Sequence, residues 1–387
     1  MATGVPGATG RRVALVCPYS LSRPGGVQGQ VVGLARSLDR LGHDVTVFAP
    51  VDRDEDAPKE FGFVATGHSV SVQANGSVAP VAVSPVAAVA ALKQLRAVRP
   101  DVVHIHEPFA PGLPYALLAA RDVPPLVATF HRSGGSLLYT LLSPVTRPLA
   151  RRLAVRCAVS EAAAATARAA LGGSFEVLFN GIEVDRFAGV VPWPTEGPTA
   201  LFLGRHEERK GLAVLLEAWD RVVGEVTAGP SGGPAPVLWV AGDGPSSAAL
   251  ARRHPESDTV RWLGVVDEAE KVSRLVAADV LAAPALGGES FGMVLLEAMA
   301  ARTVVVASDI DGYRGAAGGR AVLAPPGDPF ALAGALSGVL DGTLAGGSAG
   351  RAAWLAAGAE RAARWSMDDL ARRYEALYAG VMVGGGS

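Results

Sequence analysis

The sequence predicts an α/β fold made of two doubly wound domains, each with a parallel sheet covered by helices. Short β-rich runs alternate with helical patterns along the chain, as expected for parallel strands joined by crossover helices. A proline-rich stretch, 189–199 (GVVPWPTEGPT), interrupts this alternation near the middle. With 387 residues, the chain has the length of two ordinary domains.

The first half of the chain predicts the N-terminal domain element by element. Each expected strand is rich in apolar, β-branched residues, and most are followed by an apolar helical pattern. We therefore expect a mobile tail over 1–10 and a domain over 11–192. The expected strands cover 12–20, 44–50, 101–108, 125–131, 156–160 and 175–181, and the expected helices cover 27–43, 86–99, a run ending at 147–154, and 161–173.

The second half repeats this alternation after the proline-rich linker. The Gly/Pro-rich segment 224–236 is predicted to be a surface loop. We expect a C-terminal domain over 193–365, and over 366–387 a helix that returns to the N-terminal domain, followed by a short tail. The expected strands cover 199–205, 236–244, 260–266, 279–285 and 303–308.

The composition disfavours several classes of protein. Lys and Arg total 35 against 37 Asp and Glu, whereas nucleic-acid-binding proteins usually carry a basic excess. No apolar run reaches the roughly 20 residues that span a bilayer, and the N-terminal residues lack the apolar core of a signal peptide. Two cysteines, Cys17 and Cys157, provide neither a disulfide framework nor a metal motif. We therefore expect a cytoplasmic protein.

Two doubly wound domains each bind ligands at the carboxyl ends of their strands, so the expected active site is a cleft between domains that face each other. The segment 22–29 (SRPGGVQG) follows the first strand and opens a helix. Gly25 and Gly26 let a ligand approach the backbone there, and the helix N-terminus favours an anion. A tight turn explains these glycines equally well.

The segment 204–211 (GRHEERKG) follows the first strand of the second half. Arg205 and Lys210 lie where strand turns into helix, and two fixed cations there are suited to neutralise a diphosphate leaving group. A solvated charged loop is the alternative on this observation alone.

The segment 286–302 (LGGESFGMVLLEAMAAR) combines a glycine turn, an acid and an apolar helix. We expect the helix to begin near Ser290 or Phe291, with its first free N–H groups suited to a phosphate. Glu289 is placed either to stabilise this helix end or to bond hydroxyls of a sugar attached to the phosphate.

A second acid, Glu297, lies inside the same apolar helix. A buried ionised carboxylate needs partners, and vicinal ribose hydroxyls are good ones because each offers an O–H donor. The residues that surround Glu297 on the helix are Phe291, Val294, Leu295, Ala298 and Met299.

Glu289 and Glu297 together form the E-x7-E pattern of the retaining glycosyltransferases of family 4, which the chain resembles over nearly its whole length. The cation pair of 204–211, the AGDGP loop of 241–245 and the glycine loop of 22–29 follow the order found in that family. Further stretches, among them PGGVQ, ANGSV, VVHIHEP, VATFH, GGESFGMVLLEAMAA and VVASDID, resemble the actinobacterial phosphatidylinositol mannosyltransferases. The resemblance implies the GT-B fold, in which two doubly wound Rossmann-like domains face each other across a cleft.

The resemblance also implies a role for each matching residue. His131, Arg205, Lys210 and Glu289 are the expected catalytic residues. The donor is expected to be GDP-mannose, bound without an essential metal or other cofactor. Its expected contacts are Gly26, Arg205 and Lys210 with the diphosphate, Glu289 with the hexose, Glu297 with the ribose, Glu268 and Lys271 with guanine, and further contacts from Ser290, Phe291 and Gly292. The expected acceptor-binding residues are Tyr19, Gln28, Asn75, His131 and Arg132.

The acceptor half departs from the mannosyltransferase pattern. Pro80 stands near the place of an arginine that in these enzymes helps to hold the acceptor's phosphate, and Arg132 is a candidate replacement. The helix that is strongly basic in those enzymes keeps only three cations here, so weak contact with a membrane surface is expected. A second basic group either lines a membrane-facing helix side or is a solvated face. The cations of the two groups are Lys93, Arg96 and Arg99, and Arg147, Arg151, Arg152 and Arg156.

The expected function is therefore transfer of a hexose to a hydroxyl acceptor, with phosphatidylinositol or a related inositol lipid as the expected acceptor at the inner membrane face. Two alternatives stay open: the same chemistry on a soluble acceptor, and a nucleotide-sugar-binding protein without catalysis. Acid-x-acid spacing in 52–56 (DRDED) is interpreted as a solvated loop rather than a metal site. His104 and His106 share a strand face, but no third ligand at a telling distance supports zinc.

Overall fold

The computed structural model describes residues 10–23, 25–74, 77–132, 143–228, 234–289, 291–343 and 347–383. These residues form two compact units, which we call unit 1 (within 1–181 and 367–387) and unit 2 (within 182–366). The chain passes between the units at Gly181–Ile182 and again at Ser366–Met367. None of the helices within the described ranges has the length and apolarity needed to cross a bilayer.

The first boundary lies earlier than the expected residue 192, because the proline-rich segment is bound to unit 2. The Ser273 hydroxyl donates to the carbonyl of Val191 (2.7 Å), and the N–H of Trp193 donates to the carbonyl of Ser273. The Trp193 ring also lies 4.2 Å from the Arg274 guanidinium. The segment is thus packed along a helix rather than left as a free linker.

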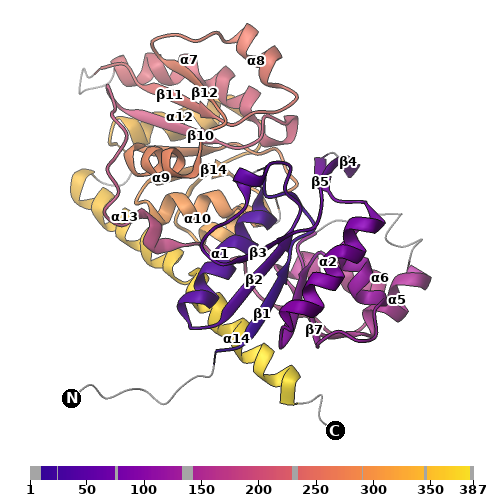
Figure 1. Ribbon diagram of the computed structural model, residues 1–387. Coiled ribbons are helices and arrows are strands. Elements are labelled where there is room, and N and C mark those ends of the chain that lie inside the picture. The colour runs from indigo at the N-terminus through magenta and orange to yellow at the C-terminus, as the bar shows by residue number, and fades with distance from the viewer. Residues whose placement is uncertain are drawn as a thin grey trace, which may run out of the picture. The chain divides into compact units, whose positions relative to one another are not determined.

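Unit 1 contains a parallel sheet in the order β3-β2-β1-β6-β7-β8-β9 (Figure 1). Its strands are β1 (Arg12–Val16), β2 (Asp44–Ala49), β3 (Gly62–Ala65), β6 (Val102–His106), β7 (Leu126–Phe130), β8 (Leu153–Ala158) and β9 (Glu176–Val177). The antiparallel hairpin β4 (Val70–Ala74) and β5 (Ser77–Val81) stands apart from this sheet. The helices are α1 (Gly26–Arg40), α2 (Pro85–Val98), α3 (Leu113–Ala119), α5 (Ser143–Ala150), α6 (Glu161–Leu171) and α14 (Met367–Val383), with the 3-10 turn η1 (Asp54–Asp56).

Strand β1 shows why both faces of this sheet are buried. Side chains alternate along a strand, so Val13 and Leu15 point to one face and Ala14 and Val16 to the other. The first pair packs in a core with residues of α1 and α14, and the second pair packs with residues of α2, α3 and α6. The C-terminal helix α14 therefore completes the core of unit 1.

Unit 2 contains a parallel sheet in the order β12-β11-β10-β13-β14-β15 (Figure 1). The fully buried Trp219 packs the first α-helix of unit 2, α7 (Leu212–Ala228), into the core. Its strands are β10 (Thr199–Leu203), β11 (Val237–Ala241), β12 (Val260–Gly264), β13 (Val280–Ala283), β14 (Val304–Ser308) and β15 (Val322–Ala324). The helices are α7 (Leu212–Ala228), α8 (Ser247–Arg253), α9 (Glu268–Ala277), α10 (Met293–Ala300), α11 (Asp311–Ala317), α12 (Pro329–Leu340) and α13 (Gly347–Ala363), with η2 (Val184–Phe187) and η3 (Glu208–Lys210).

Both sheets are doubly wound, as the sequence predicts. In unit 1 the strand order reverses between β1 and β6, and in unit 2 it reverses between β10 and β13. Loops diverge at such a switch point and leave a crevice outside the carboxyl ends of the strands. The loops after these strands are therefore the expected ligand-binding positions of each unit. Strands β3, β4, β5 and β15 were not expected from the sequence.

Candidate active site

The switch point of unit 2 brings together the charged residues of the two loops that follow β10 and β13. The Lys210 ammonium lies 2.6 Å from Oε1 of Glu289, and the Arg209 guanidinium lies 2.7 Å from the same oxygen. Glu289 is therefore in direct contact with one predicted cation and with Arg209, which the sequence reasoning did not single out. Arg205 follows β10 in the same loop.

Glycine allows the two loops to come this close. Gly211 has φ +71°, and a Cβ atom there would lie 1.8 Å from the carbonyl oxygen of Pro284. Only glycine fits such a backbone approach in the left-handed region. The N–H of Leu286 also donates to the carbonyl of Arg209 (2.8 Å). The relative position of the cations and Glu289 is thus set by backbone packing as well as by charge.

A second acid of the loop, Glu207, binds the other side of the cation group. Its carboxylate lies 2.6 Å from the Arg205 guanidinium and 2.9 Å from that of Arg209, and its side chain is only 8% exposed. Three cations thus share two carboxylates. Bidentate guanidinium groups and a lysine ammonium are typical phosphate ligands, so this group is suited to hold a diphosphate. Glu207 and Arg209 were missed because nothing in the loop sequence shows which charges point inward.

Helix α10 begins later than expected. Its first residue is Met293, not Ser290 or Phe291, because Gly292 adopts φ +76° and serves as the N-cap. A Cβ atom at Gly292 would lie 2.6 Å from Cδ1 of Tyr313. The free N–H groups of the helix therefore start two to three residues further along the chain than predicted.

The side chain of Phe291, a predicted donor-binding residue, is buried, with its ring 4.7 Å from that of Trp365 (centroid to centroid). It packs inside unit 2. Ser290, a predicted donor-binding residue, and Asn75, a predicted acceptor-binding residue, lie outside the described residues.

Glu297 has a protein partner that the sequence reasoning did not foresee. Its Oε1 lies 2.7 Å from the ammonium of Lys271, and both side chains are about 15% exposed (15% and 16%). Burial opposes the charged form of Lys271, but Glu297 and Glu268 beside it raise its pKa. A ribose is therefore not required to explain this acid.

Glu268, the first residue of α9, lies beside the same lysine. Its Oε2 is 3.5 Å from the Lys271 ammonium and also accepts from Arg186 of η2. The Glu268 side chain is 62% exposed, so burial opposes its ionisation only weakly, and Lys271 and Arg186 lower its pKa. The predicted guanine-binding pair is thus part of an ion-pair chain from Arg186 to Glu297. Arg186 was missed because it is 82 residues away in sequence from Glu268.

The switch point of unit 1 carries the glycine loop. Gly26 begins α1, is exposed, and a Cβ atom there would meet nothing within 4 Å. Gln28 is nearly buried, and its amide donates to the carbonyls of Ser20 (3.3 Å) and Arg23 (3.2 Å). The amide nitrogen of Gln28 therefore holds the loop together rather than standing free for an acceptor.

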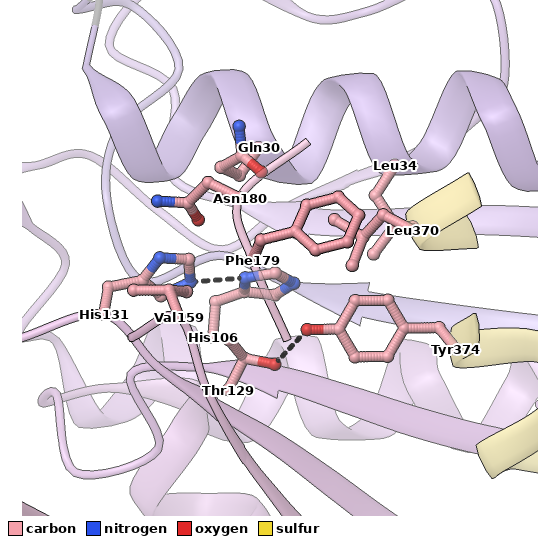
Figure 2. Close-up of a pocket in the computed structure, with 10 residues that line it drawn as sticks. All are labelled: Gln30, Leu34, His106, Thr129, His131, Val159, Phe179, Asn180, Leu370 and Tyr374. Atoms are coloured by element: carbon pink, nitrogen blue, oxygen red, sulfur yellow. Dashed lines mark hydrogen bonds between the residues drawn. The ribbon is translucent and has the colours of Figure 1, made fainter. Parts of the chain in front are cut away.

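His131 follows β7 directly and is fixed from two sides. Its backbone N–H donates to Oε1 of Glu107 (2.7 Å), and its ring Nε2 lies 2.9 Å from Nδ1 of His106 (Figure 2). Burial lowers the pKa of His131 to about 3, so the ring is neutral near neutral pH. Burial also raises the pKa of Glu107, although the N–H groups of His131 and Arg132 oppose this.

Arg132, the predicted replacement cation, lies close enough to Tyr19 and Glu107 to interact with them electrostatically. Its Nη2 is buried and has no hydrogen-bond partner among the described residues. Its charge acts on Tyr19 and Glu107, and burial together with Glu107 raises the pKa of the Tyr19 phenol. The Tyr19 hydroxyl is therefore neutral, and Nη2 of Arg132 can donate a hydrogen bond to an anionic oxygen.

The second basic group predicted from the sequence does not line one helix side, because Arg152 and Arg156 lie after the end of α5 and are partly buried. Arg147 and Arg151 are exposed, as a solvated face would have them. The guanidiniums of Arg147, Arg152 and Arg156 donate to backbone carbonyls at helix ends, where cations compensate unpaired carbonyl groups. The contacts are Arg147 with Ala170 (2.8 Å), Arg152 with Leu118 (2.9 Å), and Arg156 with Gly172 (3.1 Å) and Ala150 (2.9 Å).

The acid-x-acid segment forms a loop anchor. Asp52 accepts from the hydroxyls of Ser20 (3.0 Å) and Ser69 (2.9 Å) and from the N–H of Ser69 (2.7 Å).

The two ring nitrogens of His104 are hydrogen-bonded to the hydroxyls of Tyr378 and Thr129, each at 2.7 Å. Across the described ranges, no three side chains of metal-ligand type converge.

Comparisons with known proteins agree with this architecture. A family model described as Glycosyltransferase Family 4 matches residues 24–186, and one described as Glycosyl transferases group 1 matches residues 197–342. Phosphatidyl-myo-inositol mannosyltransferase of Mycobacterium tuberculosis is 39% identical over 308 residues, which cover 78% of this chain and 79% of that protein. The enzyme of the same description from Mycobacterium leprae is 37% identical over 385 residues, covering 97% and 98%.

Solved structures show the same fold at low identity. A glycosyltransferase from Rickettsia africae superposes with a TM-score of 0.71 at 15% identity, covering 97% of this chain and 99% of that one. HepE of Anabaena, in complex with UDP and glucose, superposes with a TM-score of 0.69 at 17% identity, covering 96% and 100%. The matched families, the relatives and the two doubly wound sheets lead to one conclusion: the chain belongs to the glycosyltransferases of family 4 and is a glycosyltransferase of the GT-B fold.

Proposed function

We propose that this glycosyltransferase moves mannose from GDP-mannose, with retention of the anomeric configuration, to the inositol of phosphatidylinositol or a related inositol lipid. The observation that carries the proposal is the contact of Glu289 with Lys210 and Arg209 at the switch point of unit 2. It combines phosphate-binding cations with a carboxylate suited to sugar hydroxyls. Relatives that are 37–39% identical are described as phosphatidyl-myo-inositol mannosyltransferases, which supports the choice of mannose and of an inositol lipid.

In the proposed reaction, the bond between the mannose C1 and the β-phosphate oxygen breaks, and the acceptor oxygen bonds to C1 on the same face. The proton of the attacking hydroxyl passes to the departing phosphate. Negative charge grows on the diphosphate as it leaves, and Arg205 and Lys210 stabilise that charge. Glu289 is proposed to hold the mannose hydroxyls, which it can do while one of its oxygens remains bound to the cations.

The test is a transfer assay with GDP-mannose and vesicles that contain phosphatidylinositol. We expect a mannosylated lipid, identified by mass spectrometry, with the α-anomer shown by NMR of the released sugar. The Glu289→Gln variant is the matched control and should form almost no product. A β-linked product would exclude retention, and product formation only from another donor would exclude GDP-mannose.

We propose that Glu268 and Lys271 recognise the guanine base. A carboxylate accepts from the N1–H and the amino group of guanine, which uracil cannot match. A ligand that binds only the folded state stabilises it by about 2.7 kcal/mol at a hundredfold excess over its dissociation constant. GDP should therefore raise the melting temperature more than UDP, and Glu268→Gln should reduce this difference. A larger shift with UDP would overturn the assignment.

We propose that α2 provides contact with the inner face of an anionic membrane. Its outward side carries apolar residues before the cations, with Val86 80% exposed and Val89 65% exposed. Lys93 follows on an exposed position, and each such cation contributes about 1 kcal/mol near an anionic surface. Binding to anionic liposomes should therefore be modest and should weaken at high salt. Flotation of the protein with anionic and neutral liposomes, at low and high salt, measures this.

A soluble acceptor is the second candidate function. The observation that favours it is the use of Arg152 and Arg156, both partly buried, to bind helix ends, which withdraws these two cations from a membrane-facing surface. Free inositol phosphates and glycosides belong in the same assay. Efficient transfer to one of them, with no flotation and no lipid product, would establish this alternative.

A further inference from the structure

His106 and His131 form a hydrogen-bonded pair at the carboxyl ends of β6 and β7. The two strands are parallel neighbours with His106 opposite Thr129, so the residues after them emerge at the same edge of the sheet. Nδ1 of His106 lies 2.9 Å from Nε2 of His131, and the rings are inclined by 25°. Figure 2 shows this contact as a dashed line between the two rings.

Both rings are neutral near neutral pH. Burial lowers the pKa of His131 to about 3, and burial, with His104 and His131 nearby, lowers that of His106 well below its ordinary value. A neutral imidazole has one N–H and one lone pair. One of the two facing nitrogens, Nδ1 of His106 or Nε2 of His131, therefore carries the proton of this hydrogen bond. If His106 donates, Nδ1 of His131 carries an N–H. If His131 donates, Nδ1 of His131 has a free lone pair.

The surroundings of His106 indicate which ring donates. Its other nitrogen, Nε2, is buried and has no hydrogen-bond partner among the described residues. The ring lines a cavity of about 10 Å³ whose other walls include the apolar Leu34, Phe179 and Leu370 and the amides of Asn180 and Gln30 (Figure 2). The Gln30 amide is bound to the backbone of Gly181 through both its nitrogen and its oxygen. An N–H without an acceptor is rarer in such a place than an unused lone pair. One water, the most that this volume holds, can donate to that lone pair.

The other hydroxyls near this cavity are already engaged. The Thr129 hydroxyl lies 2.7 Å from Nε2 of His104 and 2.8 Å from the hydroxyl of Tyr374 on α14. His104 stacks on His106 with ring centroids 4.4 Å apart. His106 is thus held in place by its strand, by His104 and by the C-terminal helix.

We propose that His106 is a positioning residue: its Nδ1–H donates to Nε2 of His131 and holds His131 in the tautomer that carries its proton on Nδ1. This inference rests on the proposed function, in which His131 lies beside the reacting sugar. In that tautomer, His131 donates a hydrogen bond to a substrate oxygen and has no free lone pair with which to take a proton. The acceptor hydroxyl must then lose its proton to the departing phosphate.

Two substitutions separate the hydrogen bond from the packing. His106→Phe keeps the ring volume and removes the donor. His106→Asn keeps a donor, because the asparagine Nδ2 stands two bonds from Cβ as Nδ1 of histidine does, and it removes part of the ring. If only packing matters, phenylalanine should be the better replacement; if the hydrogen bond matters, asparagine should be.

The first readout is the tautomer of His131, measured by ¹⁵N–¹H NMR with selectively labelled histidine. The chain has seven histidines, and a His131→Asn sample assigns the relevant signals. We expect the wild-type protein and His106→Asn to carry the His131 proton on Nδ1, and His106→Phe to show loss of this preference. A wild-type His131 protonated on Nε2, or a tautomer unaffected by His106→Phe, would overturn the proposal.

The second readout is turnover. We expect His106→Phe to lower kcat about tenfold with little change in the KM for the donor, since one neutral hydrogen bond is lost. His106→Asn should recover most of this loss. Recovery by phenylalanine instead of asparagine would show a packing role only. Because the NMR experiment needs no substrate, the tautomer result stands or fails separately from the identity of donor and acceptor.

Discussion

The candidate sites of the two units solve different chemical problems with different side chains. In unit 2 the site is a set of ion pairs, in which Glu289, Glu297 and Glu268 each contact a cation. In unit 1 the central groups are the neutral rings of His131 and His106. A charged diphosphate must be neutralised as it leaves, whereas an uncharged hydroxyl needs a fixed hydrogen-bond geometry.

The comparison also shows how each site is kept ready for its ligand. The ion pairs of unit 2 hold the cations in place at little net cost, and a phosphate can share these cations with the acids. In unit 1, buried polar groups depend on complete hydrogen bonding, because an unpaired group in an apolar surrounding is costly.

Removing a cation of unit 2 should have the largest effect. We expect Arg205→Ala and Lys210→Ala to lower kcat about 10²- to 10³-fold, roughly 2.7–4 kcal/mol of barrier, while donor affinity changes less. Steady-state kinetics and calorimetry with GDP measure the two quantities. Arg221→Ala, which breaks an exposed pair on α7, is the control. A raised KM at normal kcat in both variants would contradict the role of these cations at the leaving group.

Breaking a buried ion pair of unit 2 should lower stability. Glu297→Gln leaves the largely buried Lys271 with Glu268 alone, and we expect a loss of about 1–3 kcal/mol together with weaker donor binding. Urea denaturation followed by tryptophan fluorescence is suitable, because all six tryptophans lie in unit 2. Glu225→Gln, in an exposed pair with Arg221, should change stability by less than about 0.5 kcal/mol. Equal losses of unfolding free energy in both variants would show that the buried pair of Glu297 with Lys271 contributes no more stability than an exposed pair.

Acid should destabilise unit 1 first. Burial lowers the folded-state pKa of His104 and His131 to about 3, whereas unfolded histidine titrates near 6.5, so the unfolded chain binds more protons below that pH. Stability is therefore complete above pH 6.5 and falls as the pH decreases, by up to about 1.4 kcal/mol per pH unit for each such histidine. The raised pKa of Glu107 offsets part of this loss.

Two local probes can separate the units in this experiment. Between pH 7.5 and 5.0, hydrogen exchange in β6 and β7 should accelerate, after correction for the intrinsic pH dependence of exchange. Tryptophan emission, which reports on unit 2, should stay nearly constant. His206 of unit 2 is also buried with a lowered pKa, so a small response there is compatible with the prediction. If the tryptophan signal changed at a higher pH than hydrogen exchange in β6 and β7, unit 2 would be the more acid-sensitive unit and the prediction would be wrong.

The smallest effect should come from the helix-end arginines of unit 1. Arg152→Met removes the hydrogen bonds from Arg152 to the carbonyls of Leu118 and Ala120 at the end of α3, and we expect a loss of about 1 kcal/mol with unchanged liposome binding. Lys93→Gln on α2 should show the converse, with unchanged stability and weaker flotation. If Arg152→Met instead weakened flotation, that arginine would belong to a membrane-facing surface.

The sequence by itself determined the doubly wound fold and the loops that carry the site. Strand and helix periodicities are local signals, and in parallel sheets the loops after the strands gather at one edge, so Arg205, Lys210 and Glu289 could be assigned to neighbouring loops before any contact was known. The start of α10 was misplaced because Gly292 caps the helix in the left-handed region, at a place where Tyr313 of another element leaves no room for a side chain.

Only the tertiary structure decided which charges and hydrogen bonds face one another. Glu297 looked unpartnered because its partner Lys271 is 26 residues away, and Arg186 is 82 residues from Glu268. The hydrogen bond between His106 and His131 depends on the register of β6 and β7, which no local pattern specifies. Side-chain pairing is a property of elements packed together, because burial removes water as a competing partner and makes the choice of protein partner decisive.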